Sequence, residues 1–393
     1  MKPSMIILGI ETSCDDTALA LLEVQGETYR ILSQEASSQT ALHKKWGGVV
    51  PNLAQREHQR NLVPVLKKVL EEADLLNKKK SEKGTPDLHI LLEREQELQK
   101  KLSHFLSQYE KPPIDLISVT SHPGLEPALW VGINFAKALS ATWNIPLLGV
   151  DHLEGHLLVS LLEEEKSNNS FRLLHAPEMF PALALIVSGG HTALLLMEGL
   201  GVYRMIGETR DDAAGECFDK VARLLSLGYP GGPAIAKKAA EKQSGEYSIV
   251  LPRPMIHTKD YDFSFSGLKT AVLYDFQKRS SQVKKSASYV RAMAKEVEQA
   301  ICDVLISKTL KAVQEYGVHT VLMGGGVVAN EHLRTELKNL LHKDFPAVLF
   351  RAPNIPLCTD NGVMIAIAAF QNWEQGKRTT TIQASSHTTI SEI

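Results

Sequence analysis

The chain has 393 residues, and 44% of them are hydrophobic and 22% charged. A chain of this length exceeds what one hydrophobic core usually supports, so we expect two domains. A formal net charge of -2 provides no global basic field, so a nucleic acid substrate would have to be held by a local basic patch or by a partner. The four scattered cysteines lack CxxC spacing, which argues for a reducing compartment and against a disulfide framework or a thiolate zinc site. No stretch is long and apolar enough for a signal peptide or membrane span, so we expect a cytoplasmic protein without membrane attachment.

The first apolar runs, Met5–Ile10 and Ala18–Val24, flank a polar stretch and predict a β-hairpin. The turn, Glu11–Thr17, is dense in hydroxyl groups and backbone N–H donors, which can hold phosphate oxygens. Asp15 or Asp16 could then orient water or a cation. An ordinary polar surface turn is the alternative at this point.

A helix is predicted to begin near Asn52, after the stretch Trp46–Pro51. The composition then changes between Asn77 and Lys111, where Lys, Glu and Gln predominate. Apolar side chains recur there at spacings of four and three residues, namely Leu98, Leu102, Phe105 and Tyr109. This pattern predicts an exposed amphipathic helix or helical hairpin that packs on its neighbours or on a partner.

The next segments alternate between strand and helix patterns. Ile114–Thr120 predicts a buried strand, Ala128–Trp143 a helix and Leu147–Val150 a second strand. A Pro-Gly turn follows the first strand, so the N-terminus of the helix faces any group bound at the C-terminal edge of that strand. The alternation favours an α/β fold with parallel strands.

Two histidines follow the second of these strands. His152 and His156 are four residues apart, so they lie on one face of a helix and can bind the same metal ion, although such pairs also arise by chance. Asp360 lies in a loop that enters a C-terminal helix, and its carboxylate could be a third ligand. Two imidazoles and one carboxylate leave coordination positions open, which is typical of a catalytic ion.

The spacing of the neighbouring glutamate argues against a zinc protease. In the His-Glu-x-x-His motif the glutamate adjoins the first histidine and acts as the base. Glu154 comes one position later, about 200° around the helix from His152, and is expected to point away from the metal face.

A second hairpin is predicted after a polar loop at 163–171. The apolar strand Ala182–Val187 leads into the small polar turn Ser188–Thr192 and then into the apolar run Ala193–Met197. This repeats the construction of the N-terminus. Two hairpins of the same build predict two related domains that face each other across a cleft.

Two later segments have possible ligand-binding character, and a tail follows them. Asp212, Glu216 and Asp219 form an acidic stripe on one helix face, which is equally typical of a solvated surface. The glycine-rich turn Gly324–Asn330 lies between a strand and a helix, where a nucleotide can approach the backbone and Asn330 can bond a ribose or base. The tail after Gly376 is rich in Thr and Ser and is expected to be frayed.

These segments together resemble the TsaD family of tRNA N6-adenosine threonylcarbamoyltransferases, formerly described as O-sialoglycoprotein endopeptidases. The resemblance covers nearly the whole chain and rests on eight ordered motifs: Gly9–Asp15, Trp46–Pro51, His152–His156, Val187–Thr192, Asp211–Lys220, Phe263–Lys269, Gly324–Asn330 and Cys358–Gly362. Three features depart from the family's pattern: Asp16 stands where bacterial relatives often have Glu, Asp151 where they often have His, and 77–111 looks inserted.

The resemblance implies the actin/Hsp70/sugar-kinase-like fold, with two ribonuclease-H-like α/β domains and an interdomain cleft. We expect an N-terminal domain over 1–150, with the helical insertion at about 77–111 and a C-terminal helix at about 361–376 completing it. A C-terminal domain over 151–360 is expected to carry the metal and nucleotide motifs.

The family's site residues transfer onto matching positions of this chain. The resemblance makes His152, His156 and Asp360 metal ligands, with Fe²⁺ favoured and Zn²⁺ as the other choice, and Asp15 the catalytic acidic residue. It assigns the adenylate of threonylcarbamoyl-AMP to Ile186, Val187, Ser188, Gly189, Gly190, Asp219, Gly232 and Asn330.

The implied reaction moves the threonylcarbamoyl group from threonylcarbamoyl-AMP to N6 of adenosine 37 in tRNAs that read codons beginning with A, forming t6A and AMP. The implied partners are tRNA, a TsaB-like paralogue and a TsaE-like ATPase. An ATPase or small-molecule kinase of the same fold, a metalloprotease and a non-catalytic scaffold in a tRNA-modifying complex are the alternatives.

Overall fold

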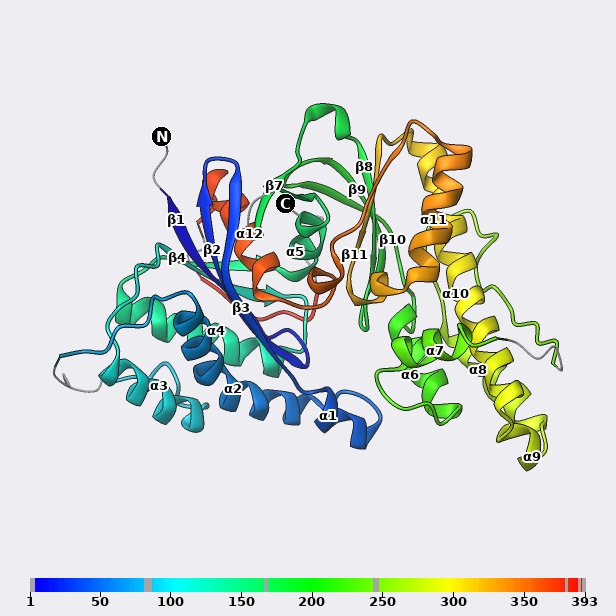
Figure 1. Cartoon of the computed structure of the whole chain (residues 1–393), viewed down its shortest axis with the longest axis horizontal. Coiled ribbons are helices and arrows are strands. Elements are labelled where there is room, and N and C mark those ends of the chain that lie inside the picture. The colour runs from blue at the N-terminus through cyan, green and yellow to red at the C-terminus, as the bar shows by residue number, and fades with distance from the viewer. Residues whose placement is uncertain are drawn as a thin grey trace. The chain divides into compact units, whose positions relative to one another are not determined.

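The computed structural model describes residues 4–80, 87–165, 169–242, 247–378, 381–387 and 390. The chain forms two compact units, which are described separately (Figure 1). The first comprises Met1–Ala41, Val49–Leu174 and Asp360–Ile393, and the second comprises Leu42–Gly48 and His175–Thr359. The short helix α1 (Thr40–His43) spans the point where the chain first passes from one unit to the other.

The first unit contains a seven-stranded sheet in the order β5-β4-β1-β2-β3-β7-β6. The strand β1 pairs antiparallel with β2, with Met5 opposite Val24, which confirms the predicted N-terminal hairpin. Parallel pairing joins β1 to β4 and β4 to β5. The bounds are β1 (Met5–Glu11), β2 (Asp16–Gln25), β3 (Thr28–Ser38), β4 (Leu116–His122), β5 (Leu147–Asp151), β6 (Leu162–Glu164) and β7 (Ser170–Leu173).

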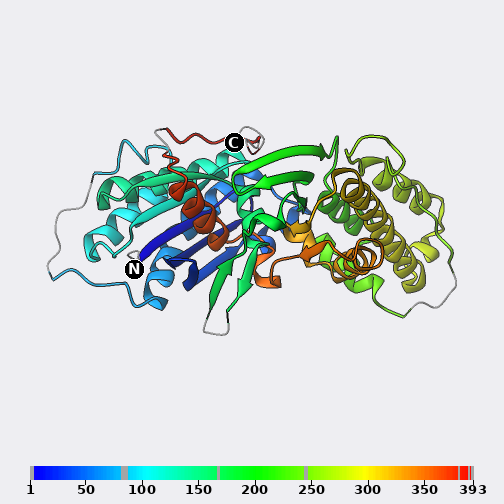
Figure 2. The same cartoon turned by 90° about the horizontal axis from the view of Figure 1, so that it is seen from above.

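Helices cover both faces of this sheet. The helices α2 (Pro51–Glu72) and α4 (Glu126–Trp143) pack on one face, where alternate strand residues such as Leu8, Ile10 and Leu19 are fully buried. The helix α12 (Gly362–Glu374) lies over the other face, above β1 and β2 (Figure 2). Because successive strand residues point to opposite faces, each strand contributes side chains to the packing against the helices on both faces.

The amphipathic pattern between residues 77 and 111 forms the helix α3 (Gln96–Gln108). Its apolar face is buried and joins the core of the first unit, where α3 packs against α2. The predicted amphipathic helix is therefore confirmed, although it is shorter than the whole segment. Residues 81–86 of the segment lie outside the described residues.

Two glycines let α12 approach the sheet closely. A Cβ atom on Gly9 in β1 would lie 2.0 Å from the carbonyl oxygen of Gly362, and a Cβ on Gly362 would lie 2.4 Å from the backbone nitrogen of Ala20. Real Cβ atoms do not come this close to other atoms, so a side chain at either position would push the helix away. The close approach fixes the first turn of α12, which Asp360 immediately precedes.

The second unit contains a five-stranded sheet in the order β10-β9-β8-β11-β12. This repeats the order β3-β2-β1-β4-β5 of the first unit, and the pairing senses are also the same: two antiparallel pairs followed by two parallel pairs. The predicted duplication is thus confirmed. The bounds are β8 (Ala182–Val187), β9 (Thr192–Gly199), β10 (Val202–Glu208), β11 (Thr320–Gly324) and β12 (Leu349–Arg351).

The duplication extends to the turn that follows the fourth strand of each unit. In the first unit, a Cβ on Gly124 would lie 2.7 Å from the carbonyl oxygen of Ser13. In the second, a Cβ on Gly325 would lie 2.5 Å from the carbonyl oxygen of Val187, and Gly325 has a φ of +92°. In both units a glycine therefore lets this turn pack directly against the hairpin turn of the first two strands.

The helices of the second unit include the long helix α10, which is buried against the sheet along much of its length. The bounds are α6 (Ala214–Leu224), α7 (Gly231–Ala239), α8 (Ser266–Lys278), α9 (Ser281–Lys284), α10 (Ala287–Tyr316) and α11 (Glu331–Asp344). Among the residues described, no helix of either unit combines the length and apolar character needed to cross a membrane.

Three expectations differ from the structure. The predicted loop at 163–171 contains β6 and β7, which pair with each other and, through β7, with β3. For that reason the first unit continues to Leu174 rather than ending at residue 150, and it holds the histidine pair that we had expected in the C-terminal domain. The tail after Gly376 is not frayed in its described part, since Ile382 is buried and its carbonyl oxygen accepts a hydrogen bond from Lys137.

Candidate metal and nucleotide sites

The first unit brings together two imidazoles and one carboxylate. Nε2 of His152 lies 3.5 Å from Oδ1 of Asp360, and Nε2 of His156 lies 3.3 Å from the same oxygen. One ligand atom from each of the three residues lies within 4.8 Å of the other two. Both histidines are buried, whereas the Asp360 side chain is 23% exposed. The predicted ligand set therefore converges at one point that remains accessible from the aspartate side.

The helix α5 (His152–Val159) positions both imidazoles. Asp151 caps its N-terminus, since its Oδ1 accepts hydrogen bonds from the backbone N–H groups of Leu153 and Glu154. Gly155 lets α5 lie against α12, because a Cβ there would be 3.0 Å from Cγ of Met364. The strand β5 ends at Asp151, the capping residue. The packing of α12 on α5 places Asp360 beside the histidines.

A buried carboxylate orients the first imidazole. Nδ1 of His152 lies 3.0 Å from Oε2 of Glu11 and 3.3 Å from Oγ of Ser13. Glu11 is fully buried at the end of β1 and also accepts a hydrogen bond from Thr120. Metal-binding histidines commonly donate their second ring N–H to a carboxylate in this way, which fixes the tautomer and raises the basicity of the metal-facing nitrogen.

The two imidazoles have opposite pKa shifts. Burial by itself lowers the pKa of His152, but the carboxylates of Asp360 and Glu11 outweigh it and raise that pKa to about 9. Burial and the neighbouring His152 lower the pKa of His156, although Asp360 partly offsets them. In the absence of a cation, Asp360 and Glu11 therefore hold one proton on the histidine pair.

The donor set fits a divalent transition metal. Nδ1 and Nε2 of His156 are buried and have no well-formed hydrogen bond to any described residue, which is costly for an imidazole unless a cation lies beside it. Imidazole nitrogen and carboxylate oxygen together suit iron and zinc, and three protein ligands leave positions for substrate or water.

Glu154 does not join this set. Its carboxylate is buried and accepts a hydrogen bond of 2.8 Å from Nδ2 of Asn372 in α12. The expectation that Glu154 points away from the metal face is confirmed, and it serves to hold α5 and α12 together.

The turn between β1 and β2 places further carboxylates near Asp360. Burial and the charge of Asp360 raise the pKa of Asp16 from 3.8 to about 7. Burial and Asp15 raise the pKa of the Cys14 thiol well above its usual value, which keeps this cysteine protonated. Asp15, the predicted catalytic residue, thus lies in the same unit and in the same electrostatic environment as the histidine pair.

Replacement of Asp16 with asparagine is expected to stabilise the metal-free protein at pH 8.5, by roughly 1–3 kcal/mol, and to stabilise it by about half as much at pH 5.5. Because the folded-state pKa of Asp16 is raised above 3.8, the folded protein holds this proton more tightly than the unfolded chain. The contribution of this proton to the free energy of unfolding is complete below the pKa that Asp16 has in the unfolded chain, and it is lost as the pH rises through about 7. Urea denaturation at both pH values measures the difference, with exposed Asp344→Asn as control, and an equal effect of Asp16→Asn at the two pH values would contradict it.

In the second unit, the predicted adenylate residues lie at the end of β8, in the turn after β11, in the middle of α6 and at the start of α7. Ile186 and Val187 are fully buried, and Ile186 is paired within the sheet to both β9 and β11. Gly189 and Gly190 are exposed in the following turn, and a Cβ on either would meet nothing within 4 Å. The exposed part of this motif is therefore Gly189 and Gly190, since Ser188 and the strand before it are buried.

Two other predicted residues have structural partners. Oδ1 of Asp219 accepts a hydrogen bond of 2.6 Å from the backbone N–H of Gly231, which orients the turn that contains Gly232. Oδ1 of Asn330 caps α11 by accepting from the backbone N–H of Leu333, and its Nδ2 donates to Glu298. Asn330 is thus held by two contacts at the end of the glycine-rich turn.

Three residues near these sites, Glu11, Ser13 and Glu298, were not predicted individually from the sequence. Glu11 ends a strand, and its Oε2 bonds a histidine 141 positions away, so no local pattern identifies it. Burial raises the pKa of Glu298, which contacts Asn330. A charged residue on the apolar face of a strand or helix, as at both positions, is the signal that could have identified them.

The chain is similar to a known protein family. The family model described as "TsaD: tRNA N6-adenosine threonylcarbamoyltransferase" matches residues 30–80 and 100–367. The unmatched stretch between them falls within the segment 77–111 that we predicted to be inserted.

Two relatives carry the name tRNA N6-adenosine threonylcarbamoyltransferase. The one from Burkholderia ambifaria (strain MC40-6) is 42% identical over 93% of this chain and 91% of its own length. The one from Acidovorax sp. (strain JS42) is 41% identical over 95% of this chain and 93% of its own length.

A solved structure resembles the fold. HypF from T. kodakarensis superposes with a TM-score of 0.52 at 13% identity over 95% of this chain, which spans about half of the HypF chain (48%). The duplicated sheets and this likeness agree with the actin/Hsp70/sugar-kinase-like fold. On the strength of the family match, the chain belongs to the TsaD family of tRNA N6-adenosine threonylcarbamoyltransferases.

Proposed function

We propose that this protein transfers the threonylcarbamoyl group of threonylcarbamoyl-AMP to N6 of adenosine 37 in tRNAs that read codons beginning with A. In this reaction the N6 nitrogen attacks the carbamoyl carbon, the bond from that carbon to the phosphate oxygen breaks, and AMP leaves. The observation that carries the proposal is the convergence of His152, His156 and Asp360 in a chain of this family.

We assign His152, His156 and Asp360 as ligands of one divalent cation, with Fe²⁺ preferred and Zn²⁺ the alternative. When bound, such an ion supplies Lewis acidity for a carbonyl or phosphate oxygen. The protein's own part is to hold the donors in place: Glu11 fixes the ring of His152, and Asp151 fixes the helix that carries both histidines.

An aromatic amine is a poor nucleophile, so positioning must supply much of the rate. We assign Asp15 to this task, as a base for the N6 proton or as a residue that orients the substrate, because it lies in the hairpin turn near the ligand set. We assign the adenylate to the backbone of Ile186, Val187, Ser188, Gly189 and Gly190 together with Asp219, Gly232 and Asn330. Support for the turn comes from the open space at Gly189 and Gly190.

We further propose that the protein works in the cytoplasm with tRNA, a TsaB-like paralogue and a TsaE-like ATPase. Its four cysteines are all unpaired, as is usual in a reducing compartment.

Mass spectrometry of nucleosides from tRNA incubated with threonylcarbamoyl-AMP tests the proposal, with and without the two partners. The wild-type protein is expected to form t6A, and Asp15→Ala is expected to form roughly 10²-fold less or none. His104→Ala, an exposed substitution on α3, is the control. Phosphate release or phosphorylation of a small molecule without tRNA, in place of t6A, would instead support a kinase or ATPase of the same fold.

A further inference from the structure

A groove in the second unit combines positive charge with aromatic side chains. One cavity of about 240 Å³ is lined by residues that include Lys44, Asp219, Arg223 and Ser226. A neighbouring cavity of about 410 Å³ shares Ser226 and is also lined by Phe276, Lys284 and Lys285. The two cavities are adjacent because both are lined by Ser226, and we call them together the Lys44–Lys285 groove.

The cations of this groove lack carboxylate partners. Within the described part of the chain, none of Lys44, Lys45, Arg223, Lys284 and Lys285 forms an ion pair, and Lys45 adjoins the lining at Lys44. Asp219 is a carboxylate in the lining, and it already accepts a hydrogen bond from the Gly231 backbone.

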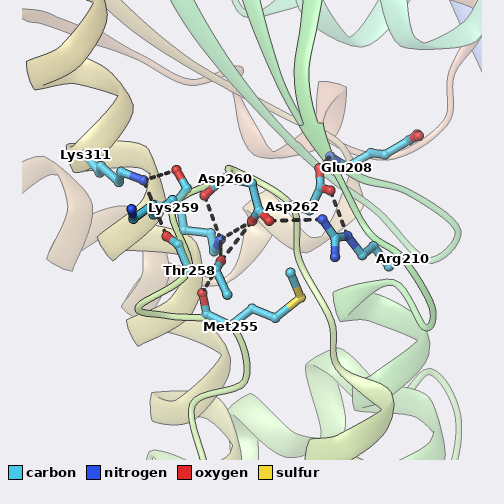
Figure 3. A network of polar contacts seen from close by, with 9 residues as sticks. Glu208, Arg210, Met255, Thr258, Lys259, Asp260, Asp262 and Lys311 are labelled. Atoms are coloured by element: carbon cyan, nitrogen blue, oxygen red, sulfur yellow. Dashed lines mark hydrogen bonds and ion pairs between the residues drawn. The ribbon is translucent and has the colours of Figure 1, made fainter.

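Some other cations of the same unit are held by polar partners. Arg210 forms ion pairs with Asp260 and Asp262, as Figure 3 shows. The buried Lys308 is paired with Asp260, and Lys311 donates to the carbonyl oxygen of Lys259. Five cations without ion pairs that lie on or beside one groove are a local concentration of positive charge in a chain of net charge -2, of the kind that attracts a polyanion.

An exposed aromatic side chain accompanies these cations. Trp46 lies in the 3-10 turn η1 (Lys44–Trp46) and is 65% exposed. Glycine at the next position lets this turn lie against Arg223, since a Cβ on Gly47 would be 2.7 Å from the arginine Nε. At the other end of the groove, Nζ of Lys284 lies 5.3 Å from the centre of the Phe276 ring.

Unpaired Lys and Arg beside exposed aromatic rings are the usual means of holding single-stranded RNA, where cations contact phosphates and aromatic rings stack on bases. An acidic protein would satisfy the cations but gives Trp46 no particular partner. A membrane surface would require a larger apolar patch than one tryptophan.

We propose that the Lys44–Lys285 groove binds the tRNA substrate, with Lys284 and Lys285 on backbone phosphates and Trp46 stacked on an unpaired base. This rests on the proposed function, since it names where that substrate lies. The groove begins at Asp219, one of the residues assigned to the adenylate, so RNA held along it would run up to the proposed nucleotide site.

Direct tRNA binding by the full-length protein, measured between about 50 and 200 mM salt, tests this proposal. The double variant Lys284→Ala/Lys285→Ala is expected to raise the Kd for tRNA roughly tenfold and to reduce the slope of log K against log salt by about 1–2. Trp46→Ala is expected to raise the Kd roughly 5- to 50-fold without changing that slope. The KM for threonylcarbamoyl-AMP should stay unchanged in both.

The matched control is Lys338→Ala/Lys343→Ala, which removes two exposed lysines of α11 in the same unit. Its tRNA affinity and salt slope should equal those of the wild type, and thermal unfolding should show that all variants fold. Wild-type tRNA affinity in both groove variants would overturn the proposal, as would a defect confined to binding a protein partner or anionic vesicles. Weakened tRNA binding by the variants supports the groove even if the wild type makes no t6A, in which case only the proposed function fails.

Discussion

Replacing His156 with alanine is expected to abolish metal binding and to lower t6A formation by roughly 10³-fold or more. His156 is fully buried, its ring nitrogens have no well-formed hydrogen bond among the described residues, and its Nε2 lies 3.3 Å from Oδ1 of Asp360. The variant keeps Asp360 and His152 but leaves two donors, which is too few for a stable site of this kind. Metal content after purification and t6A yield are the two measurements.

A second substitution distinguishes the loss of a metal ligand from a general loss of protein stability. Asp360→Asn keeps nearly the same shape but removes the negative charge, so the loss of metal should recur although no cavity is created. His104→Ala, an exposed change on α3, should leave both measurements at their wild-type values. Full metal content in His156→Ala would show that these residues are not the ligands.

Gly9→Ala is expected to lower the free energy of unfolding by roughly 3–5 kcal/mol and to reduce metal content as well. The added methyl group would lie 2.0 Å from the carbonyl oxygen of Gly362, so α12 must move away from β1. Asp360 directly precedes that helix, and a displaced helix takes the carboxylate away from the histidines. Chemical denaturation and metal analysis measure the two effects.

Gly199→Ala is the matched control, because Gly199 also lies in a strand and a Cβ there would meet nothing within 4 Å. It should have little effect on either quantity. If Gly9→Ala destabilised the protein but kept its metal, the close approach of α12 would matter for packing and not for the site.

The repeated hairpins could be predicted from the sequence because their signal is local. Apolar runs of five to eight residues around a short polar turn specify a hairpin wherever they occur, and both were found in the structure. The convergence of His152 and His156 was equally predictable, since a single helix sets it.

Features that depend on distant pairing could not be predicted in the same way. The segment 163–171 is polar, so nothing local distinguishes an edge strand from a loop, and only its pairing with β3 makes it part of the sheet. The role of Glu11 depends on a histidine in another element, and the boundary near Leu174 depends on that same strand pairing.

The position of α12 has a consequence for the order in which the protein can mature. The first unit needs the last helix of the chain, yet the second unit, which ends at Thr359, lies before that helix in the sequence. During synthesis the second unit is therefore complete while the first still lacks one layer of its core and the proposed ligand Asp360. Because domains generally fold as units as they are made, we expect any ion to be acquired only once α12 has left the ribosome.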